Sequence, residues 1–224
     1  MRKKSRLTIT LDERLLGDVD LLVDGTKIRS RSHAIETLVR QGISPRVTEA
    51  VLLAGGDEKQ SFALTRVSGR PVFANTIENL RAAGIFTVFV CGAKHNQAIK
   101  DVFGNGMDFG ITLKYIEEKQ ALGTAGALTL VEPEMSGKSI VVIHDDVISE
   151  IHFSDIIEFH LSENTQATIA VKPEFDEESY GQVMLHGNKI TEFNARGSKG
   201  ISIVNMGMYI LTQELLQKIP KNTY

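Results

Sequence analysis

Strand-like and helix-like segments alternate along most of this 224-residue chain. Four apolar runs have the length of buried strands: 50–54, 86–91, 111–116 and 139–143. Each is followed by a segment with a helical pattern: 72–83, 96–103, 125–130 and 153–160. Because a helix between two strands lets them run in parallel, the alternation predicts a Rossmann-like α/β domain with a mostly parallel sheet covered by helices.

Four further strand-like runs follow without helices between them: 167–171, 180–185, 189–193 and 201–211. They predict an antiparallel extension of the same sheet. Ligands of open α/β sheets bind outside the carboxyl ends of the parallel strands. We therefore expect the glycine-rich turns at these strand ends to bind the ligand.

The composition indicates in which cellular compartment the protein is expected. The lone cysteine, Cys91, lies in an apolar run, so a disulfide framework is excluded and a reducing compartment is expected. No run of 18 apolar residues occurs, and no continuous apolar stretch follows the basic N-terminus. A cytoplasmic protein without a membrane partner is therefore predicted.

The beginning of the chain has a different pattern. Polar and apolar side chains alternate over residues 6–11, which predicts a short strand. Asp12 is placed to cap a first helix, and a second helix is expected from about Ser30 to Gly42. A lone strand leaves its backbone groups unpaired, so we expect it to pair with the same strand of a second chain. The expected assembly is a homodimer or a higher homo-oligomer.

The net charge changes from positive to negative at a short linker around Pro45. Residues 1–46 contain ten Lys and Arg against six Asp and Glu, a balance of +4, so the net charge of −3 leaves −7 for residues 47–224. These two ranges are the predicted domains. The basic character of the first favours contact with phosphates.

A strand followed by two helices, with Ser30-Arg31-Ser32 opening the second helix, resembles the ribbon-helix-helix DNA-binding domain. The resemblance implies a dimer whose two-stranded ribbon enters the major groove of an operator. It also implies that the first amides of the second helix hold a DNA phosphate. The implied DNA-binding residues are Lys3, Lys4, Arg6, Thr8, Thr10, Ser30, Arg31 and Ser32.

Five segments of the larger domain resemble sugar-phosphate nucleotidyltransferases, in the family's order: Leu53-Ala54-Gly55-Gly56, Leu122 to Leu128, Val142 to Asp146, Tyr180-Gly181, and Val204 to Tyr209. The resemblance implies transfer of a nucleotidyl group from a nucleoside triphosphate to a sugar 1-phosphate. It assigns nucleotide binding to Leu53, Ala54, Gly55, Gly56, Glu118, Gly123, Thr124 and Ala125. It assigns sugar binding to Gly181, Asn205 and Gly207, and Mg²⁺ binding to Asp146.

The chain departs from this family pattern where the chemistry takes place. Gln60 stands at the position of the signature Arg, and Glu58 adds a negative charge where phosphate must lie. The segment that carries the family's Lys is absent, and Asn194-Ala195 replaces a Glu-Lys pair. The family's second metal carboxylate is expected beyond Tyr224. We therefore expect impaired catalysis.

The leading hypothesis is a DNA-binding transcriptional regulator whose nucleotidyltransferase-like domain senses a nucleotide, a sugar phosphate or a nucleotide sugar. The alternative is an active sugar-1-phosphate nucleotidyltransferase that uses its N-terminal domain to dimerise. A third reading is a dimeric scaffold that binds neither DNA nor a ligand.

Overall fold

A computed structural model describes residues 7–43, 47–54, 61–92, 96–118, 122–149, 151–175, 181–194 and 200–220. The chain divides into two compact units, Met1–Ser44 and Pro45–Tyr224. The division falls two residues before the boundary expected from charge and composition. Among the described helices, none has the length and apolar character needed to cross a membrane.

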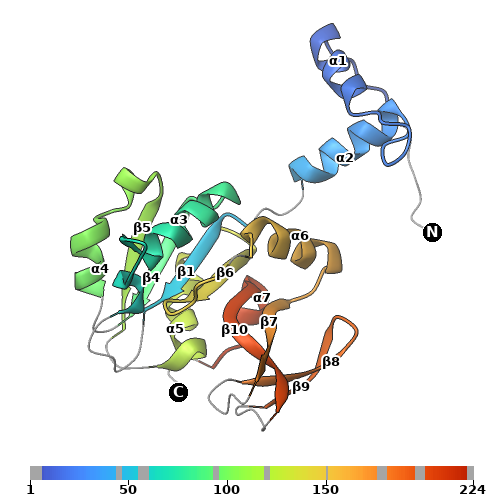
Figure 1. Ribbon diagram of the computed structural model, residues 1–224. Coiled ribbons are helices and arrows are strands. Elements are labelled where there is room, and N and C mark those ends of the chain that lie inside the picture. Colours follow the sequence, from blue (N-terminus) through green and yellow to red (C-terminus); the bar gives the residue numbers. More distant parts are fainter. Residues whose placement is uncertain are drawn as a thin grey trace. The chain divides into compact units, whose positions relative to one another are not determined.

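The N-terminal unit consists of two helices, α1 (Glu13–Leu21) and α2 (Arg31–Ile43) (Figure 1). The Asp12 carboxylate accepts a hydrogen bond of 2.9 Å from the backbone N–H of Leu15, which confirms the predicted helix cap. The second helix continues to Ile43, so the prediction that it stops at Gly42 was wrong by one residue.

Residues 7–12 precede α1 without forming a strand in this single chain. The two-stranded ribbon, and with it a ribbon-helix-helix domain, is therefore not shown. The apolar stripe of α1 was predicted to be core, but only Val19 of this helix is buried, and Leu15 is 45% exposed. In a single copy, the following described apolar side chains of this unit are exposed: Leu7, Ile9, Leu15, Leu21, Leu22, Leu38 and Val39.

The larger unit is built on one eight-stranded sheet with the order β5-β4-β1-β6-β10-β8-β9, in which β7 also pairs with β10 (Figure 1). Its strands are β1 (Glu49–Leu53), β4 (Thr87–Gly92), β5 (Thr112–Glu117), β6 (Ser139–His144), β7 (Ala167–Phe175), β8 (Gln182–His186), β9 (Lys189–Asn194) and β10 (Ile201–Thr212). Strands β5, β4, β1 and β6 are parallel, and the others join antiparallel. The predicted α/β fold with a mostly parallel central sheet is confirmed.

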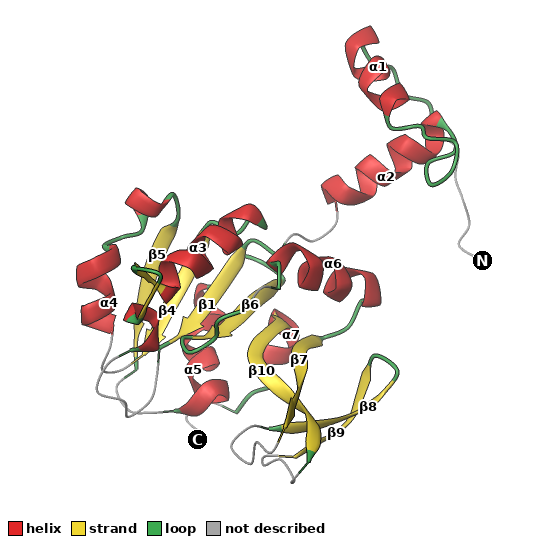
Figure 2. Cartoon of the chain, viewed as in Figure 1, coloured by secondary structure: helices red, strands yellow, loops and turns green. Residues whose placement is uncertain are grey.

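Helices cover both faces of this sheet (Figure 2). They are α3 (Val72–Ala82), α4 (Asn96–Phe103), α5 (Gly123–Val131), α6 (Phe153–Glu163) and α7 (Gln213–Leu216). Three short 3₁₀ turns, η1 (Phe62–Leu64), η2 (Met107–Phe109) and η3 (Glu132–Glu134), and a small hairpin of β2 (Arg66–Val67) and β3 (Arg70–Pro71), complete the described elements.

Alternate residues of the central strands serve two separate cores. Ala50 and Leu52 of β1 belong to the cluster that contains buried apolar side chains of α3, α4 and α6, such as Phe73. Val51 and Leu53 belong to the cluster on the other face, with α5 and α7. Because successive strand residues point to opposite faces, a fully buried parallel strand reads as a continuous apolar run.

The lone cysteine lies in the second of these cores. Burial raises the pKa of Cys91 to about 12, and the nearby carboxylate of Glu118 acts in the same direction. Since the thiolate is the reactive form, this cysteine is a packing residue, as the sequence indicated.

One histidine is buried between α6, β6 and β7. His160 is 3% exposed; its Nδ1 lies 2.9 Å from the Thr168 hydroxyl and its Nε2 lies 3.3 Å from the Ser139 hydroxyl. Burial lowers the pKa of His160 below its ordinary value of 6.5 because the charged imidazolium is disfavoured away from water.

The lowered pKa predicts an acid-sensitive fold. The unfolded chain binds a proton at His160 more readily than the folded chain does, so stability is present above pH 6.5 and is lost as the pH falls below it. We expect the urea midpoint to decrease from pH 7 to pH 5, and to decrease less in His160→Gln. The exposed His186 supplies the control, since His186→Gln should keep the full pH dependence. An unchanged pH dependence in His160→Gln would contradict this account.

Candidate functional site

The strand order of the sheet reverses at β1. The chain passes from β1 to β4 and β5 on one side and then returns to form β6 on the other side. A crevice for ligands is expected outside the carboxyl ends of the two strands at such a reversal. In this chain that position lies beyond Leu53 and His144, which are paired in register.

The end of β1 is closely packed against β4. The backbone N–H of Ala54 donates to the Cys91 carbonyl at 2.8 Å, and a Cβ atom at Gly92 would lie only 2.4 Å from the Ala54 carbonyl oxygen. Only glycine permits this approach. Leu53 and Ala54 are both buried, whereas Gly55 and Gly56, also predicted to bind nucleotide, lie outside the described residues.

The turn before α5 is shaped by Glu118 and Gly123. Glu118 is buried, and its Oε1 accepts a 2.8 Å hydrogen bond from the backbone N–H of Leu122. Gly123 has a φ of +68°, a conformation that a residue with a Cβ adopts only with strain. Gly123, Thr124 and Ala125 are exposed at the start of the helix. Their predicted role in nucleotide binding stays a prediction.

Three consecutive polar residues leave the end of β6 and have different surroundings. Asp145 is buried: its backbone N–H donates to the Leu53 carbonyl at 3.2 Å, and its Oδ2 accepts a 2.6 Å hydrogen bond from the Ser61 hydroxyl. Asp146 is exposed. His144 is partly buried, and burial lowers its pKa, while the carboxylates of Asp146 and Asp145 act in the opposite direction.

The residues predicted to bind the sugar lie together along β10 and beside β8. The backbone N–H of Asn205 donates to the Gly181 carbonyl at 2.9 Å, and the Asn205 Oδ1 accepts the N–H of Gly207 at 3.0 Å. The Asn205 side-chain amide also donates to the Tyr209 hydroxyl. The Tyr209 ring lies 5.8 Å, centre to centre, from the His144 ring.

His144 connects these residues with the turn before α5, because its Nε2 lies 3.5 Å from the Thr124 hydroxyl. The structure therefore brings predicted nucleotide, metal and sugar residues to one edge of the sheet. The sequence prediction did not include Ser61 or Tyr209 among the site residues. The Ser61–Asp145 bond joins residues 84 positions apart, and no local pattern signals it.

Within the described ranges, no cluster of three or more His, Cys, Asp or Glu side chains is arranged to hold a metal ion. Mg²⁺ commonly binds through one or two carboxylates together with substrate phosphates and water. The exposed carboxylate of Asp146 fits that mode, whereas the Asp145 carboxylate is already hydrogen-bonded to Ser61.

Three cations close to the glycine turn in the sequence, Lys59, Arg66 and Arg70, are candidates to replace the missing family cations. Arg66 donates to the Gly69 carbonyl at 2.7 Å, across the turn of the small hairpin. Arg70 pairs with Glu78 of α3, with a shortest distance of 2.6 Å, and both side chains are exposed. Both arginines are therefore surface residues with protein partners of their own. Lys59 lies outside the described residues.

Among the described residues that were predicted to bind DNA, Arg31 and Ser30 make contacts within their own unit. Arg31 makes a two-point ion pair with Asp20 of α1, at 2.5 and 2.7 Å, and this contact lowers the pKa of Asp20. The Ser30 hydroxyl accepts the N–H of His33 at 3.2 Å and so acts as a helix cap. Thr8, Thr10 and Ser32 are exposed, and Lys3, Lys4 and Arg6 lie outside the described residues.

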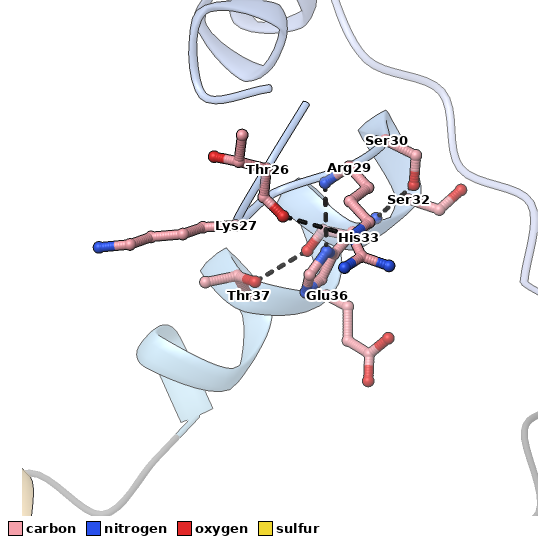
Figure 3. Close-up of a pocket in the computed structure, with 8 residues that line it drawn as sticks. All are labelled: Thr26, Lys27, Arg29, Ser30, Ser32, His33, Glu36 and Thr37. Atoms are coloured by element: carbon pink, nitrogen blue, oxygen red, sulfur yellow. Dashed lines mark hydrogen bonds between the residues drawn. The ribbon is translucent and has the colours of Figure 1, made fainter. Parts of the chain in front are cut away.

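A cavity of about 590 Å³ lies beside the start of α2 (Figure 3). Arg29 closes part of it through local bonds: its backbone N–H donates to His33 Nδ1 at 3.4 Å, and its Nε donates to the Thr26 carbonyl at 3.3 Å. These bonds stay within the turn and the first residues of α2. They hold the turn in place.

Open α/β sheets with a glycine turn at the strand reversal are typical of nucleotide-binding proteins. The chain belongs to the nucleotidyl transferase family, which matches residues 49–224.

Similar proteins include a D-glycero-alpha-D-manno-heptose 1-phosphate guanylyltransferase from Aneurinibacillus thermoaerophilus, 25% identical, with 75% of this chain and 76% of the relative covered. The mannose-1-phosphate guanylyltransferase of Mycobacterium tuberculosis is 24% identical, covering 77% of this chain and 51% of that protein. The chain thus spans about three quarters of the first relative and about half of the second.

Among solved structures, HddC from Yersinia pseudotuberculosis superposes with a TM-score of 0.69 at 21% identity, covering 80% of this chain and 82% of HddC. HddC has also been solved in complex with GMP-PN. At this level of identity the likeness supports the fold.

The prediction of a DNA-binding transcriptional regulator was wrong. The similar proteins are named as sugar-phosphate guanylyltransferases, and the family match covers residues 49–224. The basic pattern carried no information on how its charges are paired: Arg31, one of the residues assigned to DNA, pairs with Asp20 of the same unit. A short basic two-helix pattern is shared by units with different roles.

The tight approach of β10 to β6 can be tested at Gly207. This residue has a φ of +73°, and a Cβ there would lie 3.0 Å from Val147 Cγ2 and 3.3 Å from the Cβ and Cγ of His144. We expect Gly207→Ala to lower the unfolding free energy by about 2–4 kcal/mol, from backbone strain together with overpacking. Urea denaturation measures the loss.

Gly187 provides the matched control, because its φ is +64° but an added Cβ would have no neighbour within 4 Å. Gly187→Ala should cost only the backbone strain, about 1–2 kcal/mol. Equal losses in the two variants would show that the contact with His144 and Val147 is not tight.

Proposed function

We propose that this protein is a sugar-1-phosphate nucleotidyltransferase. The observation that carries the proposal is the chain of contacts from Thr124 through His144 and Tyr209 to Asn205, with the charge of Asp146 acting on His144, in a nucleotidyl transferase domain. The proposed reaction is attack by a phosphate oxygen of the sugar 1-phosphate on the α-phosphorus of a nucleoside triphosphate. The bond from that phosphorus to the bridging oxygen breaks, and pyrophosphate leaves with the electron pair.

The proposed nucleotide side of the site comprises the end of β1 and the start of α5. The backbone at Leu53 and Ala54 and the exposed turn at Gly123 and Thr124 can approach a base and phosphates closely, because no bulky side chain intervenes at the glycine. The proposed sugar side comprises Gly181, Asn205 and Gly207. Their mutual hydrogen bonds fix the backbone that a sugar hydroxyl would meet.

Asp146 is the residue proposed to hold Mg²⁺ between the two sides. When bound, Mg²⁺ neutralises charge on the phosphates as the transition state forms. Asp145 keeps the chain in place at this point, since its bonds to Leu53 and Ser61 fix the backbone next to Asp146.

The names of the similar proteins point to the substrates to test. A guanylyltransferase acting on a manno-configured sugar phosphate is the first candidate, so GTP with α-D-mannose 1-phosphate is the first pair, followed by the other nucleoside triphosphates. The purified chain should release pyrophosphate with one of these pairs in the presence of Mg²⁺.

Asp146→Ala tests the role of the carboxylate in this reaction. Turnover should fall by about 100-fold or more, because charge stabilisation in the transition state is lost. Pyrophosphate release in a coupled assay measures it. Asp108→Ala removes an exposed carboxylate from η2 and should leave turnover unchanged. The proposal fails if the wild-type chain releases no pyrophosphate with any pair tested.

We further propose that the N-terminal unit joins two copies of the chain. In its described side chains only Val19 and Ala34 are buried. Exposed apolar side chains, apart from Leu21 on another side of α1, are Leu7, Ile9, Leu15, Leu22, Leu38 and Val39. Units of about 40 residues seldom bury enough surface to fold alone, so a second copy that covers these side chains would supply the missing core.

The double variant Leu15→Glu/Leu38→Glu tests this arrangement. Charges placed on the shared apolar surface should convert a dimer into a monomer, as measured by sedimentation equilibrium. Leu21 is 85% exposed and lies off the apolar stripe of α1, so Leu21→Glu is the control and should remain dimeric. A wild-type chain that is monomeric at tens of micromolar would contradict the proposal.

A further inference from the structure

His144 contacts two different parts of the site from the end of β6. Its Nε2 lies 3.5 Å from the Thr124 hydroxyl at the start of α5. Its ring lies 5.8 Å from the Tyr209 ring of β10, with the two planes inclined by 49°. This is a favourable separation for two aromatic rings.

The backbone of β10 also lies close to His144, at Gly207. A Cβ atom at this position would lie 3.3 Å from both Cβ and Cγ of the histidine, so the glycine backbone already lies close to the ring. The register between β10 and β7 shifts between Asn205 and Tyr209, which places the irregular part of β10 at this contact. A movement of the His144 ring would therefore displace the backbone of β10.

Strand β6 occupies the centre of this arrangement. On one side His144 is paired with Leu53 of β1, and on the other side the preceding residue, Ile143, is paired with Met208 of β10. The imidazole thus stands between the proposed nucleotide turn and the proposed sugar strand. It contacts residues of both.

We propose that His144 is a positioning residue that couples binding of the nucleoside triphosphate to binding of the sugar phosphate. This inference rests on the proposed function. A nucleotide that orders Thr124 would fix the ring of His144, and the ring would hold Tyr209 and the backbone at Gly207 in the arrangement that receives the sugar phosphate. By linkage, the sugar phosphate strengthens nucleotide binding by the same factor.

The shape of histidine explains why it can carry out this task. The imidazole is a flat ring with a nitrogen at its far end, so it can meet a hydroxyl and pack on an aromatic ring at the same time. An asparagine at this position would be shorter and would have no ring face, and alanine would reach neither partner. We therefore expect His144→Ala to remove the coupling and His144→Asn to weaken it.

The experiment measures the affinity of the full chain for α-D-mannose 1-phosphate by calorimetry, with and without saturating α,β-methylene GTP and Mg²⁺. In the wild-type chain the nucleotide analogue should raise the affinity by about 5-fold or more. In His144→Ala the factor should fall to within about twofold of unity, while each ligand alone still binds. His186→Ala, which replaces an exposed histidine of β8, should keep the wild-type factor.

A double-mutant cycle identifies the path of the coupling. Thr124→Val removes the hydroxyl that faces His144 and should reduce the coupling factor. The double variant His144→Ala/Thr124→Val should show no further reduction, because both changes break the same contact. Additive reductions would mean that Thr124 and His144 act separately, and would overturn the proposed path.

A role in packing alone predicts a different result. The thermal midpoint of His144→Ala would then decrease while its coupling factor stayed at the wild-type value, and this outcome would overturn the inference. A wild-type chain that shows no coupling, or that binds neither probe, would overturn it as well. If His144→Ala were poorly folded, His144→Asn would supply the same comparison.

The two proposals can fail separately. If the wild-type chain releases pyrophosphate and His144→Ala keeps full coupling, the proposed transferase activity stands and the proposed role of His144 is wrong. If the coupling depends on His144 but the chain shows no turnover, the proposed role of His144 stands and the proposed transferase activity is wrong.

Discussion

The site depends on how the carboxyl ends of β1 and β6 are held together. Asp145 makes this connection, because its backbone N–H donates to Leu53 while its buried carboxylate accepts the Ser61 hydroxyl. A hydrogen bond to a carboxylate is stronger than one between neutral groups, and burial makes an unpaired carboxylate costly. The two strand ends are thereby fixed, and the neighbouring side chains of His144 and Asp146 leave the sheet at a defined place.

The charge argument from sequence led to the wrong function. It relied on Gln60 and Glu58 at positions where the family has other residues, and both lie outside the described residues. It also relied on the basic charge of the N-terminal segment. Counting charges cannot show which of them are already paired. Arg31 is bound to Asp20, and the family match over 49–224 together with relatives named as guanylyltransferases favours the enzyme. The short pattern of the N-terminal segment was a weaker guide to function than the resemblance of the whole larger domain to its family.

The site could be predicted in part. The glycine turn at Gly123 and the segment from Asn205 to Gly207 are contiguous motifs that the sequence shows directly, and their binding roles stay predictions. Ser61 was not predicted as a site residue, and Tyr209 was only the last residue of the matched segment Val204 to Tyr209. Their partners, Asp145 and His144, are far away in the sequence, so only the folded chain shows that they meet.

The sequence by itself determined the main strands and helices of the larger unit and their order, because buried parallel strands are continuous apolar runs and helices have a different spacing of apolar residues. It also determined where glycine is required, as at Gly123. Only the tertiary structure decided which charges are neutralised and which side chains converge, since hydrogen bonds such as Ser61–Asp145 join distant segments. Periodicity is a local property of the chain, whereas a site is made by contacts between elements that the sheet brings together.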